Sequence, residues 1–137
     1  MKFPDWVTVY GDTTYRGECP PESAEQITFF SELRRRHPDT LGRIALHPRN
    51  EGKRHHQQTA RHKAEGMTAG AADIIIPGCP AFVCELKRLD HTKSSWQPAQ
   101  REYLQAANEA GAFVCVALGW EAAMEALDVW LKSQALS

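Results

Sequence analysis

The sequence of 137 residues contains no apolar run close to the length of a membrane span, and no basic-then-apolar beginning like that of a signal peptide. Cysteine is sparse, and its four positions (19, 79, 84 and 115) form no Cys-x-x-Cys pair. Cys84 and Cys115 lie inside apolar runs, as buried free thiols usually do. These absences argue against a membrane protein and against a disulfide-stabilised secreted domain. We therefore expect a cytoplasmic protein, of a bacterium or of a phage-infected host cell.

Compact pairs of cysteine and histidine, which hold structural zinc in many small domains, are also absent. His55, His56 and His62 lie close in sequence, and with His47 they suggest either a zinc cluster or an HNH-type nuclease. Their spacing lacks the compact pairs that zinc requires, so solvated side chains that face DNA are the better interpretation. No internal repeat is present, and 42% hydrophobic and 24% charged residues are ordinary values for one soluble domain.

The net charge of −1 conceals an uneven distribution along the chain. Residues 34 to 63 contain nine lysines and arginines against two acidic residues, so this segment carries +7 and the remainder carries −8. Five of the six histidines fall in the same segment. Such a basic segment in an otherwise acidic chain is either a solvated face or a surface for a polyanion such as the phosphate backbone of DNA.

Apolar periodicity and turn residues predict alternating helices and strands, with the first helix opened by a capping box of Ser23 and Gln26. The expected elements are a helix at 23–36, a strand at 43–46, one or two helical turns at 57–65, a hairpin of strands on either side of a turn at 77–80, a helix at 98–110, a strand at 112–118 and a helix at 120–132. The second hairpin strand and the strand at 112–118 should form a right-handed parallel crossover. The sequence thus predicts an α/β fold of order α-β-β-β-α-β plus a C-terminal helix, with a mixed sheet flanked by helices. Residues 1–21 are expected to be an N-terminal extension.

Two charged residues share one face of the second hairpin strand. Successive strand side chains alternate, so Glu85 and Lys87 lie opposite the face of Cys84, which is expected to be a core thiol. Asp73 enters the first hairpin strand and should lie beside Glu85 and Lys87. Two carboxylates and a lysine at one end of a hairpin suit a structural ion pair, general acid–base catalysis or a Mg²⁺ site, and the residues alone leave these three open.

The spacing D-x11-E-x-K resembles the PD-(D/E)xK, or restriction-endonuclease-like, superfamily. In order along the chain, the segments "ESAEQITFFSEL", "NEGKR", "KAEGMTAGAAD", "CELKR" and "SSWQPAQREYLQAANEAGAFVCVALG" resemble the blocks of the VRR-NUC nucleases, over roughly residues 22–127. The resemblance implies a VRR-NUC-type nuclease domain at 22–137. Two departures stand out: Ala72 precedes the aspartate in place of proline, and Glu51 with Gly52 replaces a glycine pair.

The resemblance also implies a ligand set for Mg²⁺ or Mn²⁺. Asp73 and Glu85 would hold the metal, with the carbonyl of Leu86 as a further ligand. Glu22 corresponds to the acidic residue that opens the first helix, with Glu25 as an alternative for the same role. The plainer interpretation of Glu22 is an anion that favours the helix N-terminus.

Further roles follow from the same resemblance. Lys87 would be the catalytic lysine, and Gln100 would orient water or phosphate unless it is only a surface residue. Lys53, Arg54 and Arg61 of the basic segment would contact DNA phosphates. The expected activity is metal-dependent endonucleolytic cutting of DNA, with Holliday junctions or other branched DNA as substrates and a homodimer as the working form, because symmetric cutting of two strands needs two related sites. A catalytically silent nucleic-acid-binding module and a non-specific or flap nuclease are the alternatives.

Overall fold

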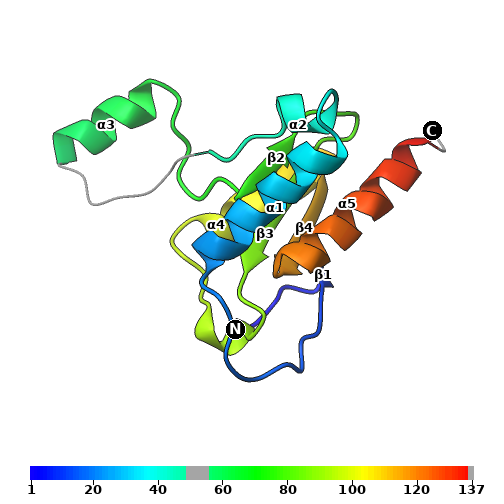
Figure 1. The fold of residues 1–137 in the computed structure, drawn as a ribbon. Coiled ribbons are helices and arrows are strands. Elements are labelled where there is room, and N and C mark those ends of the chain that lie inside the picture. The colour runs from blue at the N-terminus through cyan, green and yellow to red at the C-terminus, as the bar shows by residue number, and fades with distance from the viewer. Residues whose placement is uncertain (49–55, 136–137) are drawn as a thin grey trace.

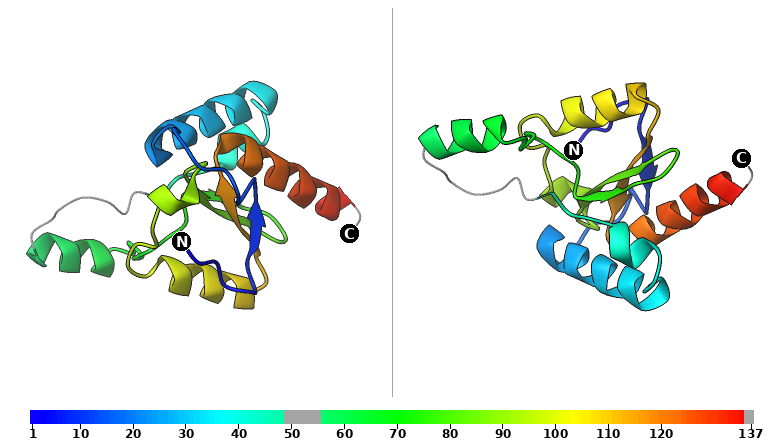
Figure 2. Two further views of the ribbon diagram at one scale, coloured as in Figure 1. Left: turned by 90° about the horizontal axis from the view of Figure 1, so that it is seen from below. Right: turned by 90° about the horizontal axis from the view of Figure 1, so that it is seen from above.

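The structure, a computed structural model, describes residues 1–48 and 56–135. Over these ranges a sheet lies between α1 and α5 on one side and α4 on the other (Figures 1 and 2). The elements are β1 (Thr8–Tyr10), α1 (Glu22–Arg36), α2 (Leu41–Ile44), α3 (His56–Ala64), β2 (Ile74–Ile76), β3 (Phe82–Lys87), a short 3-10 helix (His91–Lys93), α4 (Gln100–Glu109), β4 (Phe113–Leu118) and α5 (Trp120–Ala135). The predicted α/β architecture with a mixed sheet flanked by helices is therefore confirmed.

The sheet has four strands in the order β1-β4-β3-β2. β4 runs parallel to both of its neighbours, whereas β2 and β3 form the predicted antiparallel hairpin. Ile74 lies opposite Cys84 in that hairpin. Continuing the register by one residue brings Asp73 opposite Glu85, because each step along one antiparallel strand is a step back along the other.

Two apolar cores lie on the two faces of β3. Phe82, Cys84 and Leu86 pack on the α1 and α5 side, where Trp130 is buried as well. Val83 belongs to the second core, which Leu104 of α4 covers on the opposite face. The predicted alternation is confirmed, and Glu85 and Lys87 consequently lie on the α4 face of the sheet.

The predicted strand at 43–46 is wrong. The chain there forms the short helix α2, and Leu46 makes only an isolated antiparallel bridge with Ile75. Leu41 and Ala45 pack against the first core, a spacing of four residues that suits a helix better than a strand. The short apolar run in "RIAL" was therefore a misleading signal, and Leu46 itself is about half exposed (46%).

The predicted capping box is also wrong. Helix α1 begins at Glu22, one residue before Ser23, and no side chain caps its first turn. Pro21 is the N-cap residue in an extended conformation, which its ring favours. This start places Glu22 and Glu25 in the first turn of the helix, where carboxylates are favourable.

The range 1–21, expected to be an extension, contributes an edge strand. Strand β1 pairs with β4 in parallel, with Thr8 opposite Cys115, and Val7 is buried in the second core. No helix among the described residues is long and apolar enough to span a bilayer.

Candidate active site

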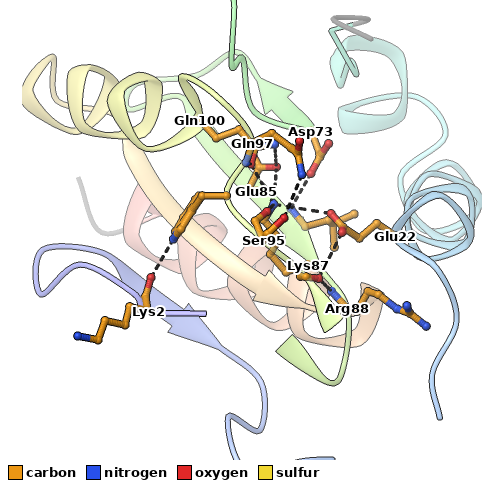
Figure 3. Close-up of polar contacts among 12 residues, drawn as sticks. Lys2, Glu22, Asp73, Glu85, Lys87, Arg88, Ser95, Gln97 and Gln100 are labelled. Atoms are coloured by element: carbon orange, nitrogen blue, oxygen red, sulfur yellow. Dashed lines mark hydrogen bonds and ion pairs between the residues drawn. The ribbon is translucent and has the colours of Figure 1, made fainter. Parts of the chain in front are cut away.

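The polar residues that the sequence analysis singled out converge at one end of the hairpin (Figure 3). Glu85 and Lys87 come from β3, Asp73 precedes β2, and Glu22 and Gln100 are the first residues of α1 and α4. The end of the α4 face of β3 is thus surrounded by a loop and two helix N-termini. The structure brings all five of these residues together. We call them the acidic cluster, after its three carboxylates; its members are Glu22, Asp73, Glu85, Lys87 and Gln100.

Gln100 joins the two charged residues of β3. Its Nε2 donates to Glu85 Oε1 at 3.0 Å, and its Oε1 accepts from Lys87 Nζ at 3.0 Å. The same Oε1 also accepts from the backbone N–H of Gln97 at 2.8 Å, which fixes the orientation of the amide. A buried lysine and a buried glutamate are therefore held apart by one amide that bonds to both.

Glu85 and Asp73 form a pair of adjacent carboxyl groups. The Leu86 backbone N–H donates to Asp73 Oδ2 at 2.9 Å, whereas no N–H or O–H of the described residues donates to the buried Glu85 Oε2. Burial raises the pKa of the Glu85 carboxyl well above its ordinary value, and the charge of Asp73 and a hydrogen bond with it raise the pKa further. Either a proton shared with Asp73 or a cation would satisfy this oxygen.

Lys87 is almost entirely buried, with 1% of its surface exposed. Its Nζ donates to the Ser95 carbonyl at 2.8 Å and lies 3.9 Å from Glu85 Oε1 and 3.8 Å from Glu22 Oε1. The ring of Trp96 lies 5.5 Å from the same nitrogen, within range of a cation–π contact. A buried ammonium needs such partners, because burial of an unpaired charge is very unfavourable.

Glu22 and Glu25 have different partners although one helical turn separates them. Glu22 Oε2 accepts from the Ser94 hydroxyl at 3.2 Å. Burial raises the pKa of Glu22, with Asp73 adding to the rise and Lys87 opposing it. Glu25 Oε2 instead accepts from the backbone N–H of Trp120 at 2.6 Å, at the start of α5. Of the two candidates for the helix ligand, only Glu22 reaches the acidic cluster.

Of the three predicted DNA contacts, Arg61 alone falls within the part of the chain that the structure describes. Lys53 and Arg54 lie outside the described residues. Arg61 belongs to α3, which stands away from the three layers in Figure 1, and it pairs with Glu65 at 2.9 Å.

The sequence analysis missed the residues that support the cluster. Ser95 contributes a backbone carbonyl and Trp96 a ring face, and the indole N–H of Trp96 donates to the Lys2 carbonyl at 2.8 Å (Figure 3). Arg88 donates to the carbonyls of Cys19 and Pro20, just before Glu22. The segment "SSW" before α4 was the one sequence signal for these supporting residues. Backbone carbonyls that accept hydrogen bonds cannot be recognised from residue types.

The carboxylate oxygens of the acidic cluster suit a hard cation, although they are too far apart to form a complete metal site. Among residues 1–48 and 56–135, no three His, Cys, Asp or Glu side chains lie close enough together to hold a metal as they stand. Asp73 and Glu85 are a pair, and Lys87 lies between Glu85 and the third carboxylate, Glu22. One or two carboxylates suffice for Mg²⁺, which keeps several waters and takes substrate phosphate oxygens. The oxygen of Glu85 that lacks a donor therefore fits a cation between it and Asp73.

The fold is that of a small α/β domain with a D…E-x-K pattern at the end of a hairpin. Comparison with solved structures finds a protein described as "VRR_NUC domain protein", which is 22% identical, with a TM-score of 0.67 over 86% of this chain and 92% of that chain. The VRR-NUC-like fold predicted from the sequence is thereby confirmed. No family model matches the sequence, and no curated protein matches it either.

Proposed function

We propose that the protein is a divalent-metal-dependent endodeoxyribonuclease that hydrolyses phosphodiester bonds. The observation that carries this proposal is the acidic cluster itself: a buried lysine, a glutamate with an oxygen that lacks a donor, and a neighbouring aspartate, bridged by Gln100. A purely structural ion pair would need neither the second carboxylate nor the unsatisfied oxygen, both of which cost stability. Likeness to a VRR_NUC domain protein supports the same proposal.

In this proposal Asp73 and Glu85 hold Mg²⁺ or Mn²⁺, with the Leu86 carbonyl and Glu22 as further ligands, direct or through water. The bound cation makes water easier to deprotonate and neutralises charge on the phosphate. Lys87 stabilises negative charge that develops on the phosphorus oxygens, and its bonds to Ser95 and Gln100 hold it in position. Gln100 fixes the Glu85 carboxylate and orients water or phosphate at the same point.

The wider proposals rest on the same activity. The partner is DNA, with branched DNA such as a Holliday junction as the substrate, and Lys53, Arg54 and Arg61 as phosphate contacts. A homodimer would have two acidic clusters related by a two-fold axis, so that both strands of a junction are cut. A light-scattering mass of one chain, with and without DNA, would contradict the dimer. The bacterial or phage-infected cytoplasm is the proposed location.

The decisive experiment measures cutting of linear, flapped and four-way DNA with Mg²⁺ and with Mn²⁺. Lys87→Ala and Asp73→Ala should abolish cutting, while DNA binding in a gel-shift assay survives. Two variants on α5 serve as controls: Lys132→Ala removes a positive charge, as Lys87→Ala does, and Asp128→Asn removes a negative charge, as Asp73→Ala does. Both controls should cut as the wild type does. A wild-type protein that binds DNA but cuts none of these substrates with either metal would instead support a catalytically silent binding module.

A further inference from the structure

An open pocket of about 270 Å³ lies beside the acidic cluster, on the same face of the sheet. Its lining includes Met67, Thr68, Ile75 and Tyr103. Ile75 and Tyr103 both pack against the second core, on the α4 side of the sheet where Glu85 and Lys87 also lie. The pocket combines an aromatic ring, a flexible thioether and an aliphatic wall with the hydroxyl groups of Thr68 and Tyr103, a lining that suits a flat ring with polar edges.

The walls of the pocket continue the elements that carry the acidic cluster. Ile75 follows Asp73 by two residues, so it points to the same face about 7 Å further along the strand. Tyr103 follows Gln100 by three residues and lies on the same side of α4, about 5 Å along the helix. A phosphate at the cluster and a group in the pocket would thus be separated by about the reach of one or two nucleotides, since stacked nucleotides are spaced about 3.4 Å apart.

The pocket is also fixed rigidly to Gln100. Gly70 lies in the turn that carries Met67 and Thr68, and a Cβ added to it would lie 2.2 Å from the Ala99 carbonyl oxygen. That oxygen accepts from the backbone N–H of Tyr103 at 2.9 Å. The turn on one side of the pocket and the helix on the other therefore meet at Ala99, directly before Gln100.

We infer that this pocket binds one unpaired nucleobase next to the scissile phosphate. The inference deepens the proposed nuclease function and rests on it. The base would stack on Tyr103, as bases do on aromatic side chains of single-strand-binding proteins. A paired base cannot enter without leaving its stack, so an unpaired nucleotide at this position is favoured over intact duplex. The site therefore favours DNA that has an unpaired nucleotide next to the cut, such as a flap, a bulge or a junction with an open pair at its branch point, over uninterrupted duplex.

The test places 2-aminopurine, a base whose fluorescence falls on stacking, at successive positions of a flapped oligonucleotide. Binding is measured without divalent cation, so that no cutting takes place. One or two adjacent positions should be quenched by wild-type protein and not by Tyr103→Leu, which keeps an apolar side chain but loses the ring. Tyr103→Phe should retain the quenching, and Tyr15→Leu, an exposed tyrosine outside the pocket, should behave as the wild type.

The same positions are then tested for cutting with Mg²⁺. An abasic nucleotide at the quenched position should slow cutting by about tenfold in wild-type protein and leave Tyr103→Leu unchanged. Thermal melting confirms that each variant is folded. If wild-type protein cuts DNA but shows no quenched position and no effect of the abasic site, the pocket inference is overturned and the nuclease proposal stands. Quenching without cutting would overturn the nuclease proposal and keep the pocket, whereas failure to bind DNA at all overturns both.

Discussion

The two faces of strand β3 are buried almost equally, yet they have opposite chemistry. Cys84 on the α1 and α5 face has no exposed surface, and Glu85 on the α4 face is 1% exposed. The pKa of each is raised well above its ordinary value: for Cys84 mainly by a hydrogen bond with Cys115 and then by burial, for Glu85 mainly by burial and then by Asp73. The thiols satisfy each other within an apolar core, whereas Glu85 keeps an oxygen without a donor beside a buried cation. Burial and a raised pKa therefore do not distinguish Glu85 from the core thiol Cys84, whereas the oxygen of Glu85 that lacks a donor does.

Exchange of one residue on each face gives the sharpest test of this contrast. Glu85→Gln keeps the shape of the side chain but removes the carboxylate, so activity on DNA should fall by roughly a hundredfold to a thousandfold. Because the charged form is disfavoured by burial, the melting temperature should stay close to that of the wild type or rise. Phe82→Ala on the opposite face should lower the free energy of unfolding by about 3–5 kcal/mol through loss of core packing.

Rates and urea-unfolding curves of the two variants are compared below the melting temperature of Phe82→Ala. Folded Phe82→Ala protein should retain most of the wild-type activity. Glu85→Gln could instead lose as much free energy of unfolding as Phe82→Ala while its folded fraction stays active. Both faces of β3 would then serve stability alone, and the proposed difference between them would be wrong.

Gly70 offers a test of how the acidic cluster depends on packing against α4. The residue has a φ of +75°, and a Cβ would lie 2.2 Å from the Ala99 oxygen and 2.7 Å from the Gln100 nitrogen. Gly70→Ala should therefore move the start of α4, lower the free energy of unfolding by about 2 kcal/mol or more, and reduce activity. Gly111→Ala is a matched control, because its φ is +97° but nothing lies within 4 Å of the added carbon.

The control should show only the backbone strain of about 1–2 kcal/mol, with activity unchanged in the folded protein. Chemical denaturation and initial rates at saturating Mg²⁺ distinguish the two variants. Equal losses of activity for both substitutions would show that the contact with Ala99 does not position Gln100.

The smallest expected effect is on stability at low pH, and it concerns Asp90 at the start of the 3-10 helix His91–Lys93. Asp90 accepts from Thr92 and from the backbone N–H of Gly17, and these hydrogen bonds, that of the Thr92 side chain first, lower its pKa to about 2. A lowered pKa means that this contribution to stability is fully present above the ordinary value of 3.8 and is lost as the pH falls through about 2.

An NMR titration of the Asp90 carboxyl should therefore have its midpoint near 2, and Thr92→Val should move the midpoint up toward 3.8. Asp90→Asn should reduce the loss in free energy of unfolding that accompanies a fall in pH from 3.8 to about 2. A midpoint for Asp90 that stays the same in Thr92→Val would show that the hydroxyl does not set the pKa.

The sequence analysis placed the acidic cluster better than it placed the elements around it. Alternation along β3 and the register of the hairpin follow from side-chain period and turn position, and these located Glu85, Lys87 and Asp73 together. The start of α1 was misplaced, because a proline N-cap leaves no polar side chain to recognise. The role of Ser95 could not be predicted at all, since a carbonyl oxygen is common to every residue.

Long-range pairing explains the remaining differences. Strand β1 has three residues and is held in place by a partner far along the chain, so the local pattern alone does not distinguish it from an irregular segment. The αL conformation of Ala99, with a φ of +71°, is likewise imposed by its surroundings, because alanine disfavours it. These two features depend on distant parts of the chain, and sequence reasoning did not find them.

The pairing of β1 with β4 has a consequence for synthesis of the protein in the cell. Thr8 leaves the ribosome well before its partner Cys115 is made. At about 5–20 residues per second, the first strand waits roughly 5–20 seconds for its neighbour. For most of this interval the nascent chain also lacks Gln100 at the start of α4, so the acidic cluster cannot be complete until synthesis has reached α4. The acidic cluster is therefore completed after β3 has been made, and not together with it.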